Sequence, residues 1–597
     1  AQLVLEGECA VPVNPAELET LPPIGEIQGV GEVSPYVNQI VAFRGVVTGS
    51  YADRNTAGIT FYTLFVQDIP GFEDGDPATS DGIALFLGRE RPSVQPGDQV
   101  RVTGQVTEFF GFTELDDGGL TVQVEANGAA LPEPVAITPG MDLERFEGMR
   151  ARLDGEAQVV GPTFSGCGFA VTLSDGPVRV FRRQSGDPVG EVLQILHTTD
   201  VNCEGFPELK VGDRVAGLVG PLIYHFDQYK IVNHGELAVT AVPLPPLTSP
   251  PVPTANQFSV VTFNMENYFD TVDDTGSDAE PKPTAATLAA KQQKLAYAIG
   301  ATLGCPTLIG VEEVENAPLL TALAEETAAL CGFTYQVTHL ESADARGIDV
   351  ALLSDPERVV VGTAVLRQGC TPIDTGIEDE TADCPAGQQP LFSRPPLQVE
   401  VSVDGQSYTL FVNHFKSKRG GEAETEPRRV AQAQHLLAVT EGMERVILLG
   451  DFNDYEQSAA MQVLDGRFTN ALLTIPDVER YSFVFGGVSQ LIDGILISPD
   501  LADALVLATI LHVNADYPDG LGDDLSRAGR PYRATDHDLP VVVMALPALP
   551  ADSAPTVTAV SEPPTSDPTP TPSPDPVEDA PSLSWPFIGG GTAVLLG

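Results

Sequence analysis

Short runs of alternating apolar and polar residues dominate the first third of the chain. One run covers residues 40–49 and ends in glycine, and another covers 99–106 after a Pro-Gly-Asp turn. A similar Gly-Asp turn lies within the run 211–220. Short strands joined by glycine corners at this spacing are typical of small closed barrels. The pattern predicts two all-β domains of the OB type, at residues 25–140 and 145–242.

The pattern changes after a proline-rich stretch, residues 243–256, which predicts a linker and a domain boundary. From residue 257 to 546, apolar strand-like runs alternate with helical stretches. We expect strands at 259–264, 307–311, 349–353, 409–413, 445–449, 492–497 and 540–544, and helices at 284–301, 317–330 and 427–440. Such alternation predicts a layered α/β domain with its polar active groups at strand ends.

The C-terminal segment has a different composition. Residues 547–582 are rich in Pro, Ser, Thr and Asp with almost no aromatic residues, which predicts a disordered stalk. Residues 583–597 are apolar but fewer than the roughly 20 that span a bilayer. Two interpretations of this tail stay open, the start of a membrane anchor and a disordered apolar end. Because the chain starts with alanine rather than methionine, we expect a mature or trimmed N-terminus.

The charge of the chain constrains its partners. Its 597 residues predict about three or four domains. They include 32 basic and 83 acidic residues, a formal net charge of −51. Such acidity favours a well-solvated secreted or salt-tolerant protein and argues against a broad electropositive surface for nucleic acid. A polyanionic substrate is compatible with this charge if metal ions and a few local cations make the phosphate contacts.

The cysteines indicate an oxidising compartment. No two of the seven stand in a C-x-x-C arrangement, which argues against a zinc site. Six cysteines allow 15 pairings. Nearest-neighbour pairing gives three disulfides and leaves Cys9 alone, while unconnected buried thiols are the alternative. The expected pairs are Cys167–Cys203, Cys305–Cys331 and Cys370–Cys384. Sparse local pairs fit an extracytoplasmic location.

Six short segments of the α/β domain carry acid, amide and imidazole groups near strand ends. They are 260–267 (VVTFNMEN), 308–316 (LIGVEEVEN), 411–418 (FVNHFKSK), 450–453 (GDFN), 490–496 (QLIDGIL) and 535–537 (TDH). Taken singly, Asp and Asn after a strand are common turn formers. Together they supply carboxylates for a divalent metal, a histidine to move protons and an amide to orient phosphate. Sites that cut phosphodiesters need this mixture.

In this order the segments resemble the endonuclease/exonuclease/phosphatase superfamily, whose best-known member is pancreatic deoxyribonuclease. The resemblance implies that the layered domain is an α/β four-layer sandwich. More narrowly, residues 257–544 resemble bacterial secreted nucleases of the ExeM/NucH-like group, in which preceding OB-like modules are also usual. The narrower resemblance rests on segments 311–316, 412–418, 481–485, 512–516 and 536–538. The chain departs from the family pattern at Glu312, Gly494 and Leu539, and the first two could alter substrate fit.

The resemblance implies a metal site. Glu313, rather than Glu312, matches the metal-holding glutamate, because the following Val-Glu-Asn fixes the register. Asn264 and Asp536 complete the metal environment, and Glu266 is a further contributor. A hard cation such as Mg²⁺ binds carboxylate and amide oxygens, with Mn²⁺ or Ca²⁺ as alternatives.

The resemblance also implies roles in catalysis. His537 matches the general base, and Asp493 orients it. Asp451 aligns the attacking water or a second metal, and Asn453 holds a phosphate oxygen. His414 donates a hydrogen bond or a proton to phosphate as charge builds. A histidine held by a carboxylate stays in one tautomer and is a stronger base near neutral pH.

These inferences predict an extracellular or surface-tethered, metal-dependent, monomeric nuclease that hydrolyses DNA, or RNA, with water as the nucleophile. Lys416 and Lys418 beside the histidine suit a nucleic-acid backbone. One alternative is a sphingomyelinase-like lipid or small-molecule phosphoesterase of the same fold. The other is a surface adhesin with a dormant catalytic domain, although no catalytic position carries an inert residue.

An acidic stretch follows the first strand of the α/β domain. Its acidic residues are Asp270, Asp273, Asp274, Asp278 and Glu280. Clustered carboxylates of this kind serve as ligands for Ca²⁺ in many loops, and they also occur on ordinary solvated loops. Both interpretations of the stretch stay open.

Overall fold

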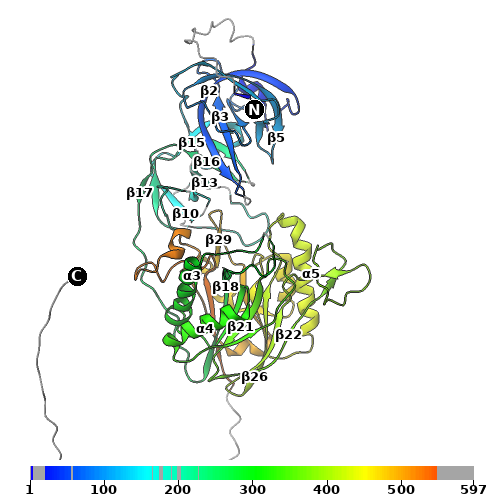
Figure 1. The fold of residues 1–597 in the computed structure, drawn as a ribbon. Coiled ribbons are helices and arrows are strands. Elements are labelled where there is room, and N and C mark those ends of the chain that lie inside the picture. The colour runs from blue at the N-terminus through cyan, green and yellow to red at the C-terminus, as the bar shows by residue number, and fades with distance from the viewer. Residues whose placement is uncertain are drawn as a thin grey trace, which may run out of the picture. The chain divides into compact units, whose positions relative to one another are not determined.

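The computed structural model describes the greater part of the chain (Figure 1). Described residues are 2–3, 21–55, 58–164, 166–173, 179–189, 191–197, 203–225, 228–277 and 279–547. The chain divides into two units, Ala1–Pro547 and Ala548–Gly597, and all described residues belong to the first. Apart from Pro547, the predicted stalk and apolar tail lie outside the described residues, as does Cys9. Within the described ranges, no helix is long and apolar enough to cross a membrane.

The first β domain contains a closed ring of five strands. In pairing order they are β2 (Ile40–Arg54), β3 (Thr60–Gln67), β4 (Gly82–Phe86), β6 (Thr113–Leu115) and β5 (Gln99–Glu108). Strand β5 pairs with both β6 and β2, which closes the ring, and only the β4–β6 pair is parallel. Inward-facing residues such as Phe43, Leu64 and Val102 form its core. Beside the ring lie α2 (Ile24–Gln28), β1 (Gln2–Leu3) and β7 (Thr121–Ala126).

The second β domain repeats this connection pattern. In pairing order its main strands are β10 (Ala157–Phe164), β11 (Gly168–Thr172), β13 (Val192–His197), β16 (Tyr229–Asn233) and β15 (Val219–Tyr224). The β13–β16 pair is parallel, as the β4–β6 pair is in the first domain. Strand β14 (Arg214–Ala216) pairs with β10 and is separated from β15 by two residues. The remaining strands are β8 (Val135–Ala136), β9 (Arg150–Arg152) and β17 (Ala238–Thr240).

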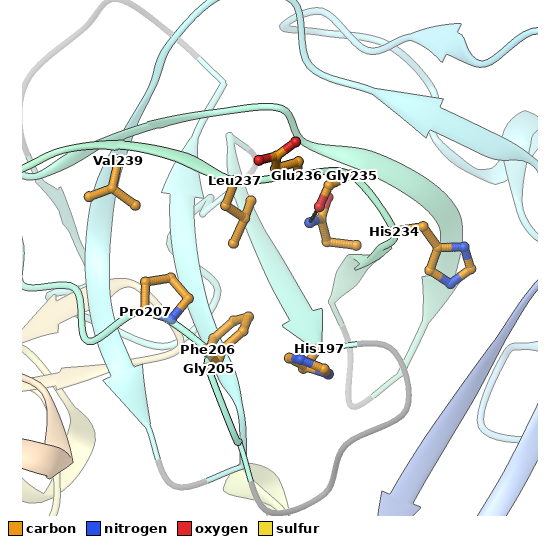
Figure 2. A pocket seen from close by; sticks show the side chains of 10 residues that line it. His197, Gly205, Phe206, Pro207, His234, Gly235, Glu236, Leu237 and Val239 are labelled. Atoms are coloured by element: carbon orange, nitrogen blue, oxygen red, sulfur yellow. Dashed lines mark hydrogen bonds between the residues drawn. The ribbon is translucent and has the colours of Figure 1, made fainter.

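A cavity of about 410 Å³ lies in this second β domain. Figure 2 shows that its lining side chains come from the end of β13, the loop 205–207 and the segment 233–239. None of the ten lining residues belongs to the predicted catalytic or metal-binding set.

Two six-stranded sheets form the α/β domain. The first contains, in order, β20 (Gln336–His339), β21 (Asp349–Ser354), β19 (Leu308–Val314), β18 (Gln257–Tyr268), β33 (Leu539–Ala545) and β32 (Leu505–Leu511). The second contains β22 (Val359–Leu366), β25 (Leu397–Val403), β26 (Gln406–His414), β27 (Val446–Asp451), β31 (Asp493–Ile497) and β28 (Thr469–Asn470).

The sheets pack face to face between two helical layers. Val260 of the first sheet and Leu410 and Ile447 of the second share one buried apolar cluster. On the outer faces, α3 (Ala285–Tyr297) and α4 (Ala317–Cys331) cover the first sheet, and α5 (Glu422–Thr440) and α6 (Ala459–Asp465) cover the second (Figure 1). Burying an apolar face on both sides of each sheet explains the continuous apolar runs of the central strands. This arrangement agrees with the predicted four-layer sandwich.

Two predicted helices differ in their bounds. Helix α5 begins at Glu422, five residues before the predicted start at Pro427. Its first turn carries Glu422 and Glu424, which suit the positive end of the helix dipole, and the Thr425 hydroxyl donates to the Gly421 carbonyl at 2.7 Å. Residues Ala298–Thr302, expected as the end of an α-helix, form a π-helical turn.

The three predicted disulfides are present. Cys167–Cys203, Cys305–Cys331 and Cys370–Cys384 have Cα–Cα separations of 5.1, 5.6 and 5.6 Å. The remaining short elements are β23 (Cys370–Thr371), β24 (Gln389–Pro390) and 3₁₀ turns at Glu144–Phe146, Ala471–Thr474, Asp477–Glu479, Pro499–Ala504 and Asp519–Asp523.

Candidate active site

Strand pairing brings the polar residues of the second sheet together. His414, Asp451 and Asp493 are directly opposite one another on β26, β27 and β31. In the first sheet, Asn264 on β18 is opposite Glu312 on β19. The Asn264 side chain crosses between the sheets, and its amide donates to Asp451 Oδ2 at 3.2 Å. The ends of these strands therefore form one buried polar cluster.

Irregular backbone shapes this cluster. The pairing register shifts on β18 after Asn264 and on β19 after Glu312. Glu266, Glu313 and Asn453 have φ values of 47°, 57° and 51°, in the left-handed region that non-glycine residues rarely adopt. Such conformations cost about 1–3 kcal/mol each and concentrate at functional sites, where the surrounding structure imposes them. The bulges re-aim the side chains at the ends of both strands.

Asp451 lies at the centre of the cluster. Its Oδ2 accepts from the Asn453 amide at 3.0 Å, and its Oδ1 accepts from the Asn453 backbone N–H at 2.7 Å. His414 Nε2 and His537 Nε2 lie 3.6 and 4.0 Å from Asp451 Oδ2. The second N–H of the Asn453 amide donates to the Phe415 carbonyl at 3.2 Å. The Asn453 amide can therefore donate a hydrogen bond to a phosphate oxygen only if its bond to Asp451 or to Phe415 breaks.

His537 is fixed by a buried carboxylate. Its Nδ1 lies 2.8 Å from Asp493 Oδ2, and Phe483 packs on the imidazole with ring centroids 4.9 Å apart. The Asn514 amide donates to the His537 carbonyl at 2.7 Å, which holds the backbone. Because Nδ1 donates to Asp493, Nε2 is left facing Asp451.

The environments of the two histidines displace their pKa values in opposite directions. Burial alone would lower the pKa of His537, but the charges of Asp493 and Asp536 outweigh burial and hold that pKa well above its usual value. Burial and then the positive charge of Arg394 keep the pKa of His414 well below its usual value. One imidazole is thus stabilised as a cation and the other as a neutral donor, a division typical of acid–base sites.

Two of the predicted metal ligands, Asn264 and Glu313, lie on strands of the first sheet, and Asp536 lies in the loop that precedes β33. Glu313 Oε1 is 3.8 Å from His414 Nε2, and Glu313 Oε2 accepts from the Asn267 N–H at 3.0 Å. Burial, and then the charge of Glu266, raise the pKa of Asp536 to about 6. The donor set of two carboxylates and the Asn264 amide oxygen suits a hard divalent cation, and crowded carboxylates of like charge are stabilised by one.

Clusters tight enough to surround a cation as they stand lie elsewhere in the described ranges. Two groups of three ionisable side chains have ligand atoms within 4.8 Å of one another, and neither includes Glu313 or Asp536. The groups are Asp270, Asp274, Glu315 and His339, Glu341, Asp349. Asp349, interpreted from sequence as a strand-start residue, accepts from His339 at 2.9 Å.

The two predicted substrate-binding lysines have intramolecular partners. Lys418 Nζ donates to the Asn453 carbonyl at 2.7 Å and lies 4.0 Å from the ring centroid of Tyr455. Lys416 Nζ donates to the Arg419 carbonyl at 3.1 Å. Lys418 therefore supports the backbone of Asn453 and borders the cluster rather than pointing freely into solvent.

Glu312, where the chain departs from the family pattern, is a buried residue of the cluster. It is fully buried, its Oε1 accepts from the Thr262 hydroxyl at 3.0 Å, and its Oε2 has no hydrogen-bond partner. Burial, and then the charge of Asp493, raise its pKa well above the usual value. A protonated Glu312 has the shape of a glutamine and carries no charge. Gly494, a second departure from the family pattern, makes room for Phe452, whose ring lies 2.9 Å from the place that a Cβ would occupy.

A segment of the second β domain also reaches the site. Strand β12 (Val180–Phe181) pairs in parallel with β30 (Val488–Gln490), which with β29 (Phe483–Phe485) forms a hairpin beside His537. We call residues 179–183 the arm. The arm is invisible to sequence reasoning because it joins residues about 310 positions apart, and two-residue strands have no periodicity to detect.

Arginines of the arm contact aromatic residues of the α/β domain. The Arg179 guanidinium lies 3.9 Å from the ring centroid of Tyr481 and forms an ion pair with Asp516. Arg182 Nη1 donates to the Tyr455 hydroxyl at 3.3 Å, on the ring that Lys418 also contacts. The arm thus adds positive charge to the border of a strongly acidic protein.

Comparison with known proteins identifies the α/β domain. Residues 259–507 match the endonuclease/exonuclease/phosphatase family, so the chain contains a domain of this family. Over 161 residues the chain is 24% identical to Endonuclease YhcR of Bacillus subtilis; this stretch is 26% of the chain and only 12% of that relative.

Solved structures that resemble the chain cover about half of it. A conserved protein of unknown function from Enterococcus faecalis is 14% identical, with 48% of this chain and 100% of that one covered and a TM-score of 0.32. TDP2 of D. rerio in complex with a single-strand DNA product is 16% identical, with coverages of 48% and 98% and a TM-score of 0.33. A family protein from Bacteroides vulgatus is 14% identical, with coverages of 49% and 99% and a TM-score of 0.32.

Proposed function

We propose that this endonuclease/exonuclease/phosphatase domain hydrolyses phosphodiester bonds of nucleic acid, DNA in the first instance, with water as the nucleophile. The observation that carries the proposal is the placement of Asp451 between His414 and His537, at 3.6 and 4.0 Å from their Nε2 atoms. The relatives named as an endonuclease and as a DNA-product complex support the same substrate class.

His537 acts as the general base. In its neutral form, with Nδ1–H donated to Asp493, its Nε2 takes a proton from the attacking water. The imidazolium that results is the state that Asp493 and Asp536 stabilise, as the raised pKa of His537 indicates. The product of the proton transfer is therefore stabilised before the substrate arrives.

His414 acts on the phosphate. Its low pKa keeps the ring neutral, so that it donates one N–H without carrying a charge of its own. Nε2 faces the centre of the cluster, where charge on a phosphoryl oxygen builds as water attacks. Asn453 holds Asp451 in place through two hydrogen bonds and supplies an amide N–H to phosphate when one acceptor is released.

Glu313, Asp536 and Asn264 would hold the divalent cation, Mg²⁺ by preference for hard oxygen ligands. When bound, the cation supplies charge stabilisation at phosphate and lowers the pKa of a coordinated water. Glu266 completes the surroundings indirectly: it pairs with Lys291 at 3.3 Å and Arg533 at 3.5 Å, and its backbone N–H donates to the Asn264 amide oxygen at 3.0 Å.

An extracellular location and OB-type barrels are part of the proposal. Three local disulfides and the net charge of −51 suit a secreted, well-solvated protein. The single parallel pair in each otherwise antiparallel five-stranded arrangement supports the OB type. We assign these two domains a scaffold or docking role. The arm, which belongs to the second of them and pairs with β30 beside the site, serves this role.

A lipid phosphodiesterase is the second candidate, because exposed aromatic side chains lie near the site. Phe485 is 66% exposed and stacks at 6.3 Å on Phe483, which contacts His537. Exposed rings of this kind insert into lipid headgroups and also stack on nucleobases.

The test is cleavage of supercoiled plasmid DNA and of sphingomyelin vesicles by the purified protein, each with Mg²⁺ and with EDTA. We expect metal-dependent nicking, a loss of at least about 100-fold in His537→Ala, and full activity in His435→Gln, a half-buried histidine outside the cluster. Cleavage of the vesicles alone would select the lipid candidate. Equal activity in His537→Ala would refute the mechanism.

A further inference from the structure

A compact group of carboxylates lies apart from the catalytic cluster, at the exits of β18 and β19. Asp270 and Asp274 belong to the loop after β18, and Glu315 follows β19 directly. Each places a carboxylate oxygen within 4.8 Å of the other two. Three like charges at this separation repel one another strongly unless a cation lies among them.

The Glu315 side chain has an unsatisfied oxygen. It is 4% exposed, its Oε2 accepts from the Asp270 N–H at 2.6 Å, and its Oε1 is buried without a hydrogen-bond partner. A buried carboxylate oxygen that has lost water and gained no donor is costly. This unpartnered oxygen is evidence for a ligand that is independent of the acidic composition of the loop.

Neighbouring carboxylates have cationic partners, whereas this group has none among the described residues. Asp273 pairs with Lys282 at 2.6 Å, and Glu313 lies 3.4 Å from Arg346. No ion pair to Asp270, Asp274 or Glu315 occurs in the described ranges. A bound cation would supply the missing charge.

We propose that Asp270, Asp274 and Glu315 form a structural Ca²⁺ site. Ca²⁺ takes six to eight oxygen ligands in flexible geometry, so loop carboxylates, backbone carbonyls and water together suit it better than the octahedral Mg²⁺. The loop is already shaped for this role, because the Glu280 carboxylate accepts the backbone N–H groups of Asp274 and Thr275 at 2.9 and 2.8 Å.

The site would connect the loop to the catalytic strand. The Asn316 amide donates to Asp270 Oδ2 at 3.2 Å, and its oxygen caps helix α4 by accepting the Leu319 N–H at 2.9 Å. Glu315 lies two residues after the predicted metal ligand Glu313. A cation bound here fixes the exits of both strands and the start of α4 without touching substrate.

Isothermal titration of the metal-free full chain with CaCl₂ tests the proposal. We compare the wild type with Glu315→Gln, Asp274→Asn, Glu313→Gln and Asp273→Asn, and record thermal unfolding of each with and without Ca²⁺. The Glu313→Gln variant removes a predicted metal ligand of the catalytic cluster and leaves Asp270, Asp274 and Glu315 intact. Asp273→Asn is the matched control, an acid of the same loop outside the group.

We expect a Ca²⁺ binding event that depends on this group, with a Kd on the order of 0.1–1 mM, and a rise in the unfolding midpoint of about 2–3 °C at tenfold excess over Kd. Glu315→Gln and Asp274→Asn should abolish this binding event and the rise in unfolding midpoint. Glu313→Gln and Asp273→Asn should retain the binding event and the rise. Metal-free Glu315→Gln should unfold at or above the wild-type midpoint, because one repelling charge is gone. Ca²⁺ binding that is unchanged in Glu315→Gln and Asp274→Asn, or that is absent from the wild type, overturns the proposal.

Discussion

Replacing Asp493 by asparagine isolates what its charge contributes to His537. Asp493 Oδ2 accepts from His537 Nδ1 at 2.8 Å, and both side chains are buried. Asparagine has the same shape, and its amide oxygen can accept the same N–H. The substitution therefore preserves the tautomer and orientation of the imidazole but removes the negative charge that stabilises the imidazolium.

The size of the effect follows from this contact. A hydrogen bond to a charged group contributes about 1.5–3 kcal/mol, against about 0.5–1.5 kcal/mol for a neutral one. The proposed transition state contains a nearly formed imidazolium, so most of the charged contribution is lost from the barrier. Since about 1.4 kcal/mol corresponds to a factor of ten in rate, we expect kcat to fall roughly 10- to 100-fold, with little change in KM.

The assay is steady-state hydrolysis of an activated phosphodiester, such as bis(p-nitrophenyl) phosphate, over a pH range. Asp493→Asn should also move the acidic limb of the pH–rate profile to lower pH, because a general base is inactive when protonated and the pKa of His537 falls when the carboxylate charge is removed. The double variant Asp493→Asn/His537→Ala should be no slower than His537→Ala alone. A kcat within threefold of wild type, or a full additional loss in the double variant, would show that Asp493 does not act through His537.

Three further outcomes are expected. Glu312→Gln keeps the acceptor for the Thr262 hydroxyl and should retain activity in the plasmid assay within about threefold, whereas a loss comparable to His537→Ala would assign the proton of Glu312 a role in catalysis. Burial raises the pKa of Glu114 to about 8, so the folded state holds a proton that the unfolded state releases above about pH 4.5. Stability contributed by this group is therefore lost as pH rises from about 4.5 to about 8. The variant Glu114→Gln should flatten the decline of the unfolding midpoint between pH 5 and 8. The exposed Glu26→Gln is the control and should leave that decline unchanged. Arg179→Ala leaves Asp516 without its cation and should destabilise the protein by about 3–5 kcal/mol in denaturant titration; a change below about 0.5 kcal/mol would show that the arm is not anchored there.

The sequence predicted elements and residues that depend on local pattern. Continuous apolar runs predicted the central strands. The polar groups just after these runs lie close together because neighbouring strands end at the same edge of their sheet. The same reasoning could not predict that the Glu312 carboxyl is buried in the cluster. Its burial depends on the β19 bulge and on packing against the second sheet. The pattern also predicts the wrong start for α5: the expected helix begins at Pro427, whereas the helix begins at Glu422 with an acidic first turn.

The acidic charge of the chain is compatible with the proposed anionic substrate because of where the few cations lie. Arg346 lies beside Glu313 at 3.4 Å, Arg394 pairs with Asp344 at 3.2 Å, and Arg179 of the arm pairs with Asp516. Each of these arginines borders the site, and each is neutralised by a carboxylate, so the arginines shape the site without creating a positive field around it. In the proposed function, attraction of a polyanion would then depend on divalent cations at the cluster and on lysines at its border such as Lys418. On this reasoning, binding of substrate should be sensitive to the concentration of divalent cation and much less sensitive to monovalent salt than binding to a basic surface would be.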